Sequence, residues 1–305
     1  MGRKECDKQA FKRNTDSCAN SKGCPPRHSS THGRMTTVAR DAIILEFCAT
    51  LEKLTTSLRR DIATISADLE LVQTPFESDK DSQGTTQEGA RPEVPDNPRA
   101  VIQRRTAILV LYSYWESIIK ESSERYLTLV ESTCADAAGL CSPLRTLHRW
   151  TILNNDGYLN RTSNLALSAH SILLKDNLDE NIPSFSRHIV SPNSNLNAER
   201  FESICQWLNI DFGQFNVITD IRLPGTTPAK KYSSFLYQGN SITESIDRFV
   251  GYRNKVAHSA LTKPPNLTIC SFYRAFIPEL ISAFIGLLQD MAIQHSWMGA
   301  SAPLT

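Results

Sequence analysis

The sequence lacks an excess of charge of either sign. Its 305 residues carry 33 Lys and Arg against 32 Asp and Glu, a formal net charge of +1. A protein that binds nucleic acid mainly by releasing counterions usually has a strongly basic domain. This charge balance therefore excludes electrostatic binding of nucleic acid over the whole chain. Apolar residues make up 40% of the sequence, which is enough for a sizeable core and excludes wholesale disorder.

Long apolar runs are also absent. The longest apolar stretch near the C-terminus, residues 281–288, is far short of the about 20 residues that a membrane span needs. The N-terminus has no apolar segment of the secretory type. The eight cysteines are scattered through the chain, whereas a disulfide framework has short spacings. We therefore expect a cytoplasmic protein with no membrane partner, in which Cys48, Cys134, Cys141, Cys205 and Cys270 are small buried hydrophobic residues.

The familiar motifs for cofactors and metals are missing. There is no Gly-rich phosphate loop, no His-Glu-x-x-His, no Gly-x-Ser-x-Gly and no Cys-x-x-Cys. Cys6, Cys18, Cys24, His28 and His32 lie together near the N-terminus, but their cysteines do not have the close spacing of a zinc finger. The sequence predicts no cofactor and no metal site.

Residues 1–34 differ from the rest of the chain. They are polar, and they carry eight basic residues against three acidic ones, a net charge of +5 that leaves −4 for the remainder. We expect a basic, disordered tail. Met35 directly precedes a well-patterned helix, so in a second interpretation the native chain begins there.

Apolar residues spaced by three and four predict two long helices, over residues 36–71 and 101–133. Between them, residues 73–100 are rich in Pro, Ser, Thr and acidic residues, which predicts a flexible linker. The predicted domains are thus an N-terminal helix (35–72), the linker, and a helical domain (101–300) with an insertion at about 134–240.

Shorter helices are predicted along the rest of the chain, at 144–153, 165–174, 197–208, 241–261 and 267–297. Pro278 should kink or divide the last of them. Residues 211–239 are ambiguous and fit a short strand or a loop. The pattern predicts an all-α fold, a bundle with long antiparallel helices and a partly irregular insertion.

The helix predicted at 241–261 has a cation where its apolar stripe calls for an aliphatic side chain. Steps of three and four from Ile246 and Phe249 lead to Arg253. An unpaired buried guanidinium is very costly, so Arg253 should meet a carboxylate, a subunit interface or a ligand phosphate. His258 follows five residues later, about 140° around an ideal helix, so one straight helix does not bring the two side chains together.

The segment Arg253-Asn254-Lys255-Val256-Ala257-His258 resembles the Arg-x4-6-His motif of HEPN ribonucleases, including the polar residue after the Arg. The predicted helix at 101–133 is similar to the N-terminal helix of RiboL-PSP-type HEPN proteins, where an apolar run leads to an aromatic-Glu pair, here Trp115-Glu116. The resemblance implies a HEPN-type helical bundle.

The resemblance further implies a metal-independent endoribonuclease. Arg253, Asn254 and His258 would be its catalytic residues, placed around one cleft by the paired helices of a homodimer. Lys255 and Tyr252 would line the path of the RNA substrate, and Glu116 would be the structural partner of Arg253. A toxin or antiviral effector with an antitoxin or sensor protein as partner fits this activity.

Structural interpretations compete with these roles. His258 could be a solvent-facing residue that suits the C-terminal helix dipole, and Arg253 could form a purely structural ion pair with Glu116. Tyr112, Tyr114 and Trp115 have core spacing and are expected to pack. The alternative to a ribonuclease is a non-catalytic HEPN-like module that binds a protein or a nucleotide.

Overall fold

The computed structural model describes residues 36–71, 98–155, 178–187, 195–217, 241–258 and 265–299, which all belong to one compact unit, Arg34–Thr305. These residues form α-helices and short 3-10 helices and no β-strand, with one isolated bridge between Leu140 and Met298. The predicted all-α fold is confirmed. The basic tail with its Cys and His residues, most of the linker and the helix predicted at 165–174 lie outside the described residues.

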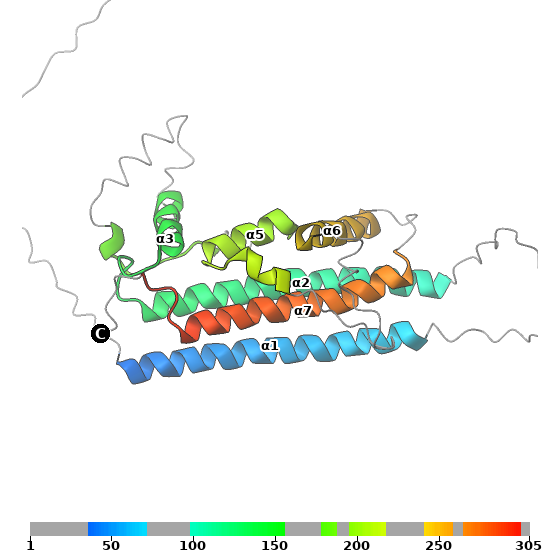
Figure 1. Cartoon of the computed structure of the whole chain (residues 1–305), viewed down its shortest axis with the longest axis horizontal. Coiled ribbons are helices and arrows are strands. Elements are labelled where there is room, and N and C mark those ends of the chain that lie inside the picture. Colours follow the sequence, from blue (N-terminus) through cyan, green and yellow to red (C-terminus); the bar gives the residue numbers. More distant parts are fainter. Residues whose placement is uncertain are drawn as a thin grey trace, which may run out of the picture. The chain divides into compact units, whose positions relative to one another are not determined.

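Three long helices form the centre of the fold: α1 (Thr37–Leu71), α2 (Pro98–Thr133) and α7 (Leu267–Ile293). Figure 1 shows them side by side. The Tyr114 hydroxyl of α2 donates to Asp61 Oδ2, and the rings of Phe47 and Tyr126 meet farther along, so α1 and α2 are antiparallel. Gln289 Nε2 of α7 donates to a backbone carbonyl of α1. In Figure 1, α7 runs parallel to α2 and antiparallel to α1.

The stripes predicted from the sequence are the faces on which these helices pack. Most of the apolar side chains on these faces are buried, and burial of each contributes about 1.5–3 kcal/mol. Among the most completely buried are Leu51 and Leu58 of α1, Ile108, Trp115 and Ile119 of α2, and Phe276, Leu280, Phe284 and Leu288 of α7.

Helix α7 decides one part of the prediction that Pro278 kinks or divides the helix. Pro278 does not divide it, because the helix continues from Leu267 to Ile293 with Pro278 buried in the core. Packing on α1 and α2 outweighs the local loss of one helical hydrogen bond.

By length and composition, α7 could also cross a membrane. In this structure, however, 56% of its most apolar 18-residue segment is buried, as is typical of the core helix of a soluble protein.

Shorter elements cover the side of α2 away from α1 (Figure 1). Helix α6 (Ile242–His258) packs on α2, α5 (Ala198–Trp207) packs on α6, and α3 (Ser142–Asn155) contacts α5. Where the structure describes the ambiguous segment 211–239, it is a 3-10 helix, η4 (Phe212–Val217), and so neither a strand nor a plain loop.

The described part of the insertion is held firmly to the bundle. The backbone N–H of Phe185 donates to Glu131 Oε1 at 2.8 Å, and Arg187 forms an ion pair with the same carboxylate. The short 3-10 helix η2 (Leu178–Glu180) is tied to α3 by a two-bond ion pair between Arg149 and Asp179. These segments are therefore an integral part of the helical fold.

The five described cysteines are free thiols, as expected. Burial is the main cause that raises the pKa of each thiol, to about 12 for Cys134 and about 11 for Cys270. Thiolates are therefore scarce at neutral pH, which suits packing rather than nucleophilic chemistry. Only two are fully buried, Cys205 and Cys270; the other three are half-buried, less than predicted.

Candidate functional site

Helix α6 starts at a reciprocal cap. The Ser241 hydroxyl accepts a hydrogen bond from the Glu244 backbone N–H at 3.2 Å, and the Glu244 carboxylate accepts one from the Ser241 backbone N–H at 3.0 Å. Such a capping box satisfies two backbone donors that the first turn would otherwise leave unpaired. It fixes where the helix begins.

Arg253 is half-buried and lies against Tyr112 of α2. The Cζ atom of its guanidinium is 4.6 Å from the centre of the Tyr112 ring, within cation–π range. Its Nη1 also donates to Oδ1 of the neighbouring Asn254 at 3.0 Å. Within the described part of the chain the Arg253 guanidinium thus contacts an aromatic face and an amide oxygen, not the carboxylate that was one of its expected partners. Its remaining donors have no partner among the hydrogen bonds of the described residues.

Asn254 receives a second hydrogen bond from outside the helix. Nδ2 of Asn195, in the segment that leads into α5, donates to the same Oδ1 at 3.0 Å. An amide oxygen has two lone pairs, and here both are occupied. The group of Asn254 that remains to meet a ligand is therefore its NH2, which can only donate.

Hydrogen bonds to α2 and α6 hold the segment around Asn195 in place. The buried Leu196 backbone N–H donates to the Tyr112 hydroxyl at 2.8 Å, and its carbonyl accepts from Trp115 Nε1 at 3.0 Å. Asn197 caps α5, and the Ala198 N–H donates to Asp247 Oδ1 of α6 at 2.9 Å. Aromatic residues of α2 thus place this segment beside α6.

Tyr112 contacts both Arg253 of α6 and the segment that leads into α5. Burial raises the pKa of its phenol to about 12, with a further increase from the nearby Glu116 carboxylate, while the Leu196 N–H and Arg253 act in the opposite direction. The phenol is therefore neutral at physiological pH, with its ring under Arg253 and its oxygen accepting the Leu196 N–H.

Glu116 was expected to pair with Arg253. The ion pair that the structure shows for Glu116 is with Lys120, one turn along α2, at 2.5 Å. No ion pair within the described part of the chain joins Glu116 to Arg253. Glu116 also contributes to the raised pKa of Tyr112.

Of the other predicted site residues, Tyr252 and Lys255 flank the Arg253–Asn254 pair in sequence and His258 ends the helix. Tyr252 is half-buried and packs edge-on against Tyr273 of α7, with ring centres 6.0 Å apart. Lys255 is exposed, and so is His258, the last residue of α6. None of the hydrogen bonds of the described residues brings His258 to Arg253, as the five-residue spacing indicates.

Comparison with known families decides the identity of this fold. The model of the RiboL-PSP-HEPN family matches residues 77–290. The chain belongs to the RiboL-PSP-HEPN family. No curated protein and no solved structure matches it.

The match confirms the resemblance inferred from the sequence. It contains α2, α6 and most of α7, and with them the whole arrangement around Arg253. Helix α1 precedes the matched residues. The role of the Arg-x4-His segment of this HEPN chain remains a prediction.

Two residues around the Arg253–Asn254 pair were missed or misjudged from the sequence. Asn195 lies 59 residues before its partner Asn254, and no local pattern marks it. Tyr112 was expected only to pack, whereas its ring also carries the Arg253 cation and its hydroxyl holds the Leu196 N–H. The prediction closest to the contact between Asn195 and Asn254 was the start of a helix at residue 197.

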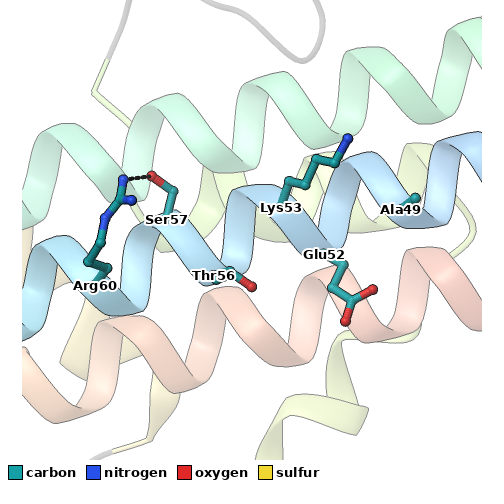
Figure 2. Close-up of a pocket in the computed structure, with 6 residues that line it drawn as sticks. All are labelled: Ala49, Glu52, Lys53, Thr56, Ser57 and Arg60. Carbon is teal, nitrogen blue, oxygen red and sulfur yellow. Dashed lines mark hydrogen bonds between the residues drawn. The ribbon is translucent and has the colours of Figure 1, made fainter.

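A separate hollow lies on the outer face of α1. Its described lining residues all come from this helix: Ala49, Glu52, Lys53, Thr56, Ser57 and Arg60. Figure 2 shows Arg60 turned toward Ser57, to which its Nη2 donates at 3.4 Å. The hollow shares no residue with the Arg253 site and has no set of groups that points to chemistry.

Proposed function

We propose that this HEPN protein is a metal-independent endoribonuclease whose site forms where the α6 helices of two copies meet. The observation that carries the proposal is the Arg253–Asn254 pair. A half-buried guanidinium and an amide NH2, held side by side, offer hydrogen-bond donors and a positive charge to one anion. Arg binds phosphate in a bidentate manner and stabilises charge that develops on its oxygens.

His258 supplies the proton transfers in this proposal. Imidazole ordinarily titrates close to neutrality, so it can take a proton from a ribose 2′-hydroxyl and give one to the leaving 5′-oxygen. The 2′-oxygen attacks the adjacent phosphorus and the bond to the 5′-oxygen breaks. The products are a 2′,3′-cyclic phosphate and a 5′-hydroxyl, so the reaction requires RNA and no metal.

A second copy of the chain completes the site. Within one α6, Arg253 and His258 lie about 140° apart on an ideal helix. Paired α6 helices would bring the His258 of one copy toward the Arg253–Asn254 pair of the other. The exposed Lys255 would supply local positive charge along the RNA, and Tyr252 would border it. A cytoplasmic toxin or defence effector, restrained by an antitoxin or sensor protein, fits such an activity.

The alternative is a non-catalytic HEPN module that binds a protein or a nucleotide. It is favoured by one observation: His258 is exposed and makes no hydrogen bond to the Arg253–Asn254 pair within the described part of one copy. In that case α6 would bind an anion without cutting it.

The test is cleavage of RNA by the purified full chain in the presence of EDTA, with wild type beside His258→Ala. We expect the wild type to release 2′,3′-cyclic phosphate ends and His258→Ala to lose at least about 100-fold in rate, the lower end for a general acid–base group. Lys53→Ala, which removes an exposed side chain of α1, is the control and should retain activity. Gel filtration with light scattering reports the dimer. Equal cleavage by wild type and His258→Ala would refute the ribonuclease proposal; binding without cleavage would favour the alternative.

A further inference from the structure

We propose that Asn195 is a positioning residue of the site: it fixes the amide of Asn254 so that the Asn254 NH2 faces the substrate phosphate. The inference rests on the proposed function and adds to it a residue from the insertion, far from α6 in sequence.

The direction of each hydrogen bond follows from chemistry. The guanidinium of Arg253 has donors and no acceptor, so the Asn254 atom 3.0 Å from its Nη1 must be the oxygen. Asn195 approaches the same oxygen at 3.0 Å, so it must present its NH2. The reversed amide of Asn254 would place its NH2 against two other donors. Arg253 thus sets the orientation of the Asn254 amide, and Asn195 adds a second hydrogen bond to the same oxygen.

Asn195 is well placed to hold that orientation during a reaction. It is half-buried, and the next residue, Leu196, has both backbone groups bonded to aromatic side chains of α2. Arg253 is the other group on the Asn254 oxygen, and it must also serve the phosphate. When Arg253 turns toward a phosphate, the hydrogen bond from Asn195 still holds the Asn254 side chain in place.

Two substitutions of Asn195 have different expected effects. Asn195→Ala removes the donor and frees the Asn254 amide to rotate, and the loss of one such hydrogen bond corresponds to a decrease of about 3- to 10-fold in kcat/KM for RNA. Asn195→Asp replaces the donor by a carboxylate of nearly the same shape. That carboxylate would repel the Asn254 oxygen and attract the Arg253 guanidinium away from the phosphate, so its decrease should exceed that of Asn195→Ala.

A double-mutant cycle separates positioning from a merely structural role. The rates of wild type, Asn195→Ala, Asn254→Ala and the double variant are compared. If Asn195 acts through Asn254, Asn195→Ala has no further effect once Asn254 is alanine. If the two losses multiply, Asn195 does not act through Asn254 and the inference is overturned. Asn181→Ala, an exposed residue of the same insertion, is the control and should match the wild type.

The readout does not depend on cleavage alone. The same cycle is measured for binding of a single-stranded DNA oligonucleotide, which has the phosphates and lacks the 2′-hydroxyl needed for cutting. If the wild type cuts no RNA, the proposed function fails. The positioning role then stands if the binding losses are non-additive, and is overturned if they are additive or if the oligonucleotide does not bind. If Asn195→Ala does not fold, the near-isosteric Asn195→Asp takes its place, with the same criterion applied to its effect in the Asn254→Ala background.

Discussion

Tyr112→Phe tests the structural basis of the site directly. The change leaves the ring that packs under Arg253 and removes only the hydroxyl, whose oxygen accepts the Leu196 N–H at 2.8 Å. Leu196 is 0% exposed, so water has no route to replace the lost acceptor. A buried donor left unpaired costs about 1–3 kcal/mol, and this is the expected decrease in the free energy of unfolding.

Tyr114→Phe, two residues along α2, is the matched control. Its hydroxyl donates to Asp61 Oδ2 at 2.9 Å, but both side chains reach solvent, so water can replace the bond and the expected cost is below about 1 kcal/mol. Urea unfolding with linear extrapolation measures both variants, and thermal unfolding should show about 2–4 °C per kcal/mol.

The pH dependence of Tyr112→Phe provides a second measurement. Because burial raises the pKa of Tyr112 to about 12, the folded state keeps the phenol neutral where the unfolded chain, with a pKa near 10, has lost the proton. The stabilisation is fully present below pH about 10 and is lost as the pH rises toward 12. The free energy of unfolding of Tyr112→Phe should not show this part of the decrease at high pH. A cost below about 0.5 kcal/mol at pH 7, or equal costs for the two Tyr→Phe variants, would refute the reasoning.

The remaining predictions concern the cap of α6 and the insertion. Ser241→Ala removes the side-chain half of the capping box and should lower the free energy of unfolding by about 1 kcal/mol, whereas exposed Ser113→Ala in the middle of α2 should change it less; equal effects would contradict the role of the cap. Asp179→Asn breaks the ion pair with Arg149, which lowers the pKa of Asp179. The pair is partly exposed, so the expected loss at pH 7 is only about 0.5–1 kcal/mol. This stabilisation is present above the unfolded pKa of about 4 and disappears as the pH falls through the lower folded pKa, so the variant and the wild type should converge near pH 2 in urea unfolding. A difference that persists there would exclude the ion pair as its cause.

The long helices could be predicted from sequence because their signal is local and repeated. Apolar residues at steps of three and four mark α1 and α2 over nine or ten turns, and the structure places these ends within a few residues of the prediction. The capping box at Ser241 is similarly local. Pro278 shows the limit of local reasoning: its effect within one helix is unfavourable, and the packing that outweighs it comes from two other helices.

The site was only partly predictable, for the same reason. Arg253 was recognised as a cation in an apolar stripe, and its need for partners followed from desolvation. Which partners it has could not be derived, because an aromatic ring and an amide oxygen can also serve as partners of a guanidinium, and no local pattern distinguishes them from a carboxylate. Glu116 instead forms an ion pair with Lys120 on its own helix. The contact between Asn195 and Asn254 depends on how the insertion folds back onto α2.

Helix α1 shows that the unit recognised by family resemblance and the unit that folds are different. The family match begins at residue 77, after α1 has ended. Yet Leu51 and Leu58 of α1 are 0% and 1% exposed, packed into the same core as α2 and α7. Without α1, the α2 and α7 surfaces that it covers would face water. A boundary drawn where sequence similarity stops would therefore cut through the hydrophobic core, and α1 belongs to the domain on physical grounds even though the family description leaves it out.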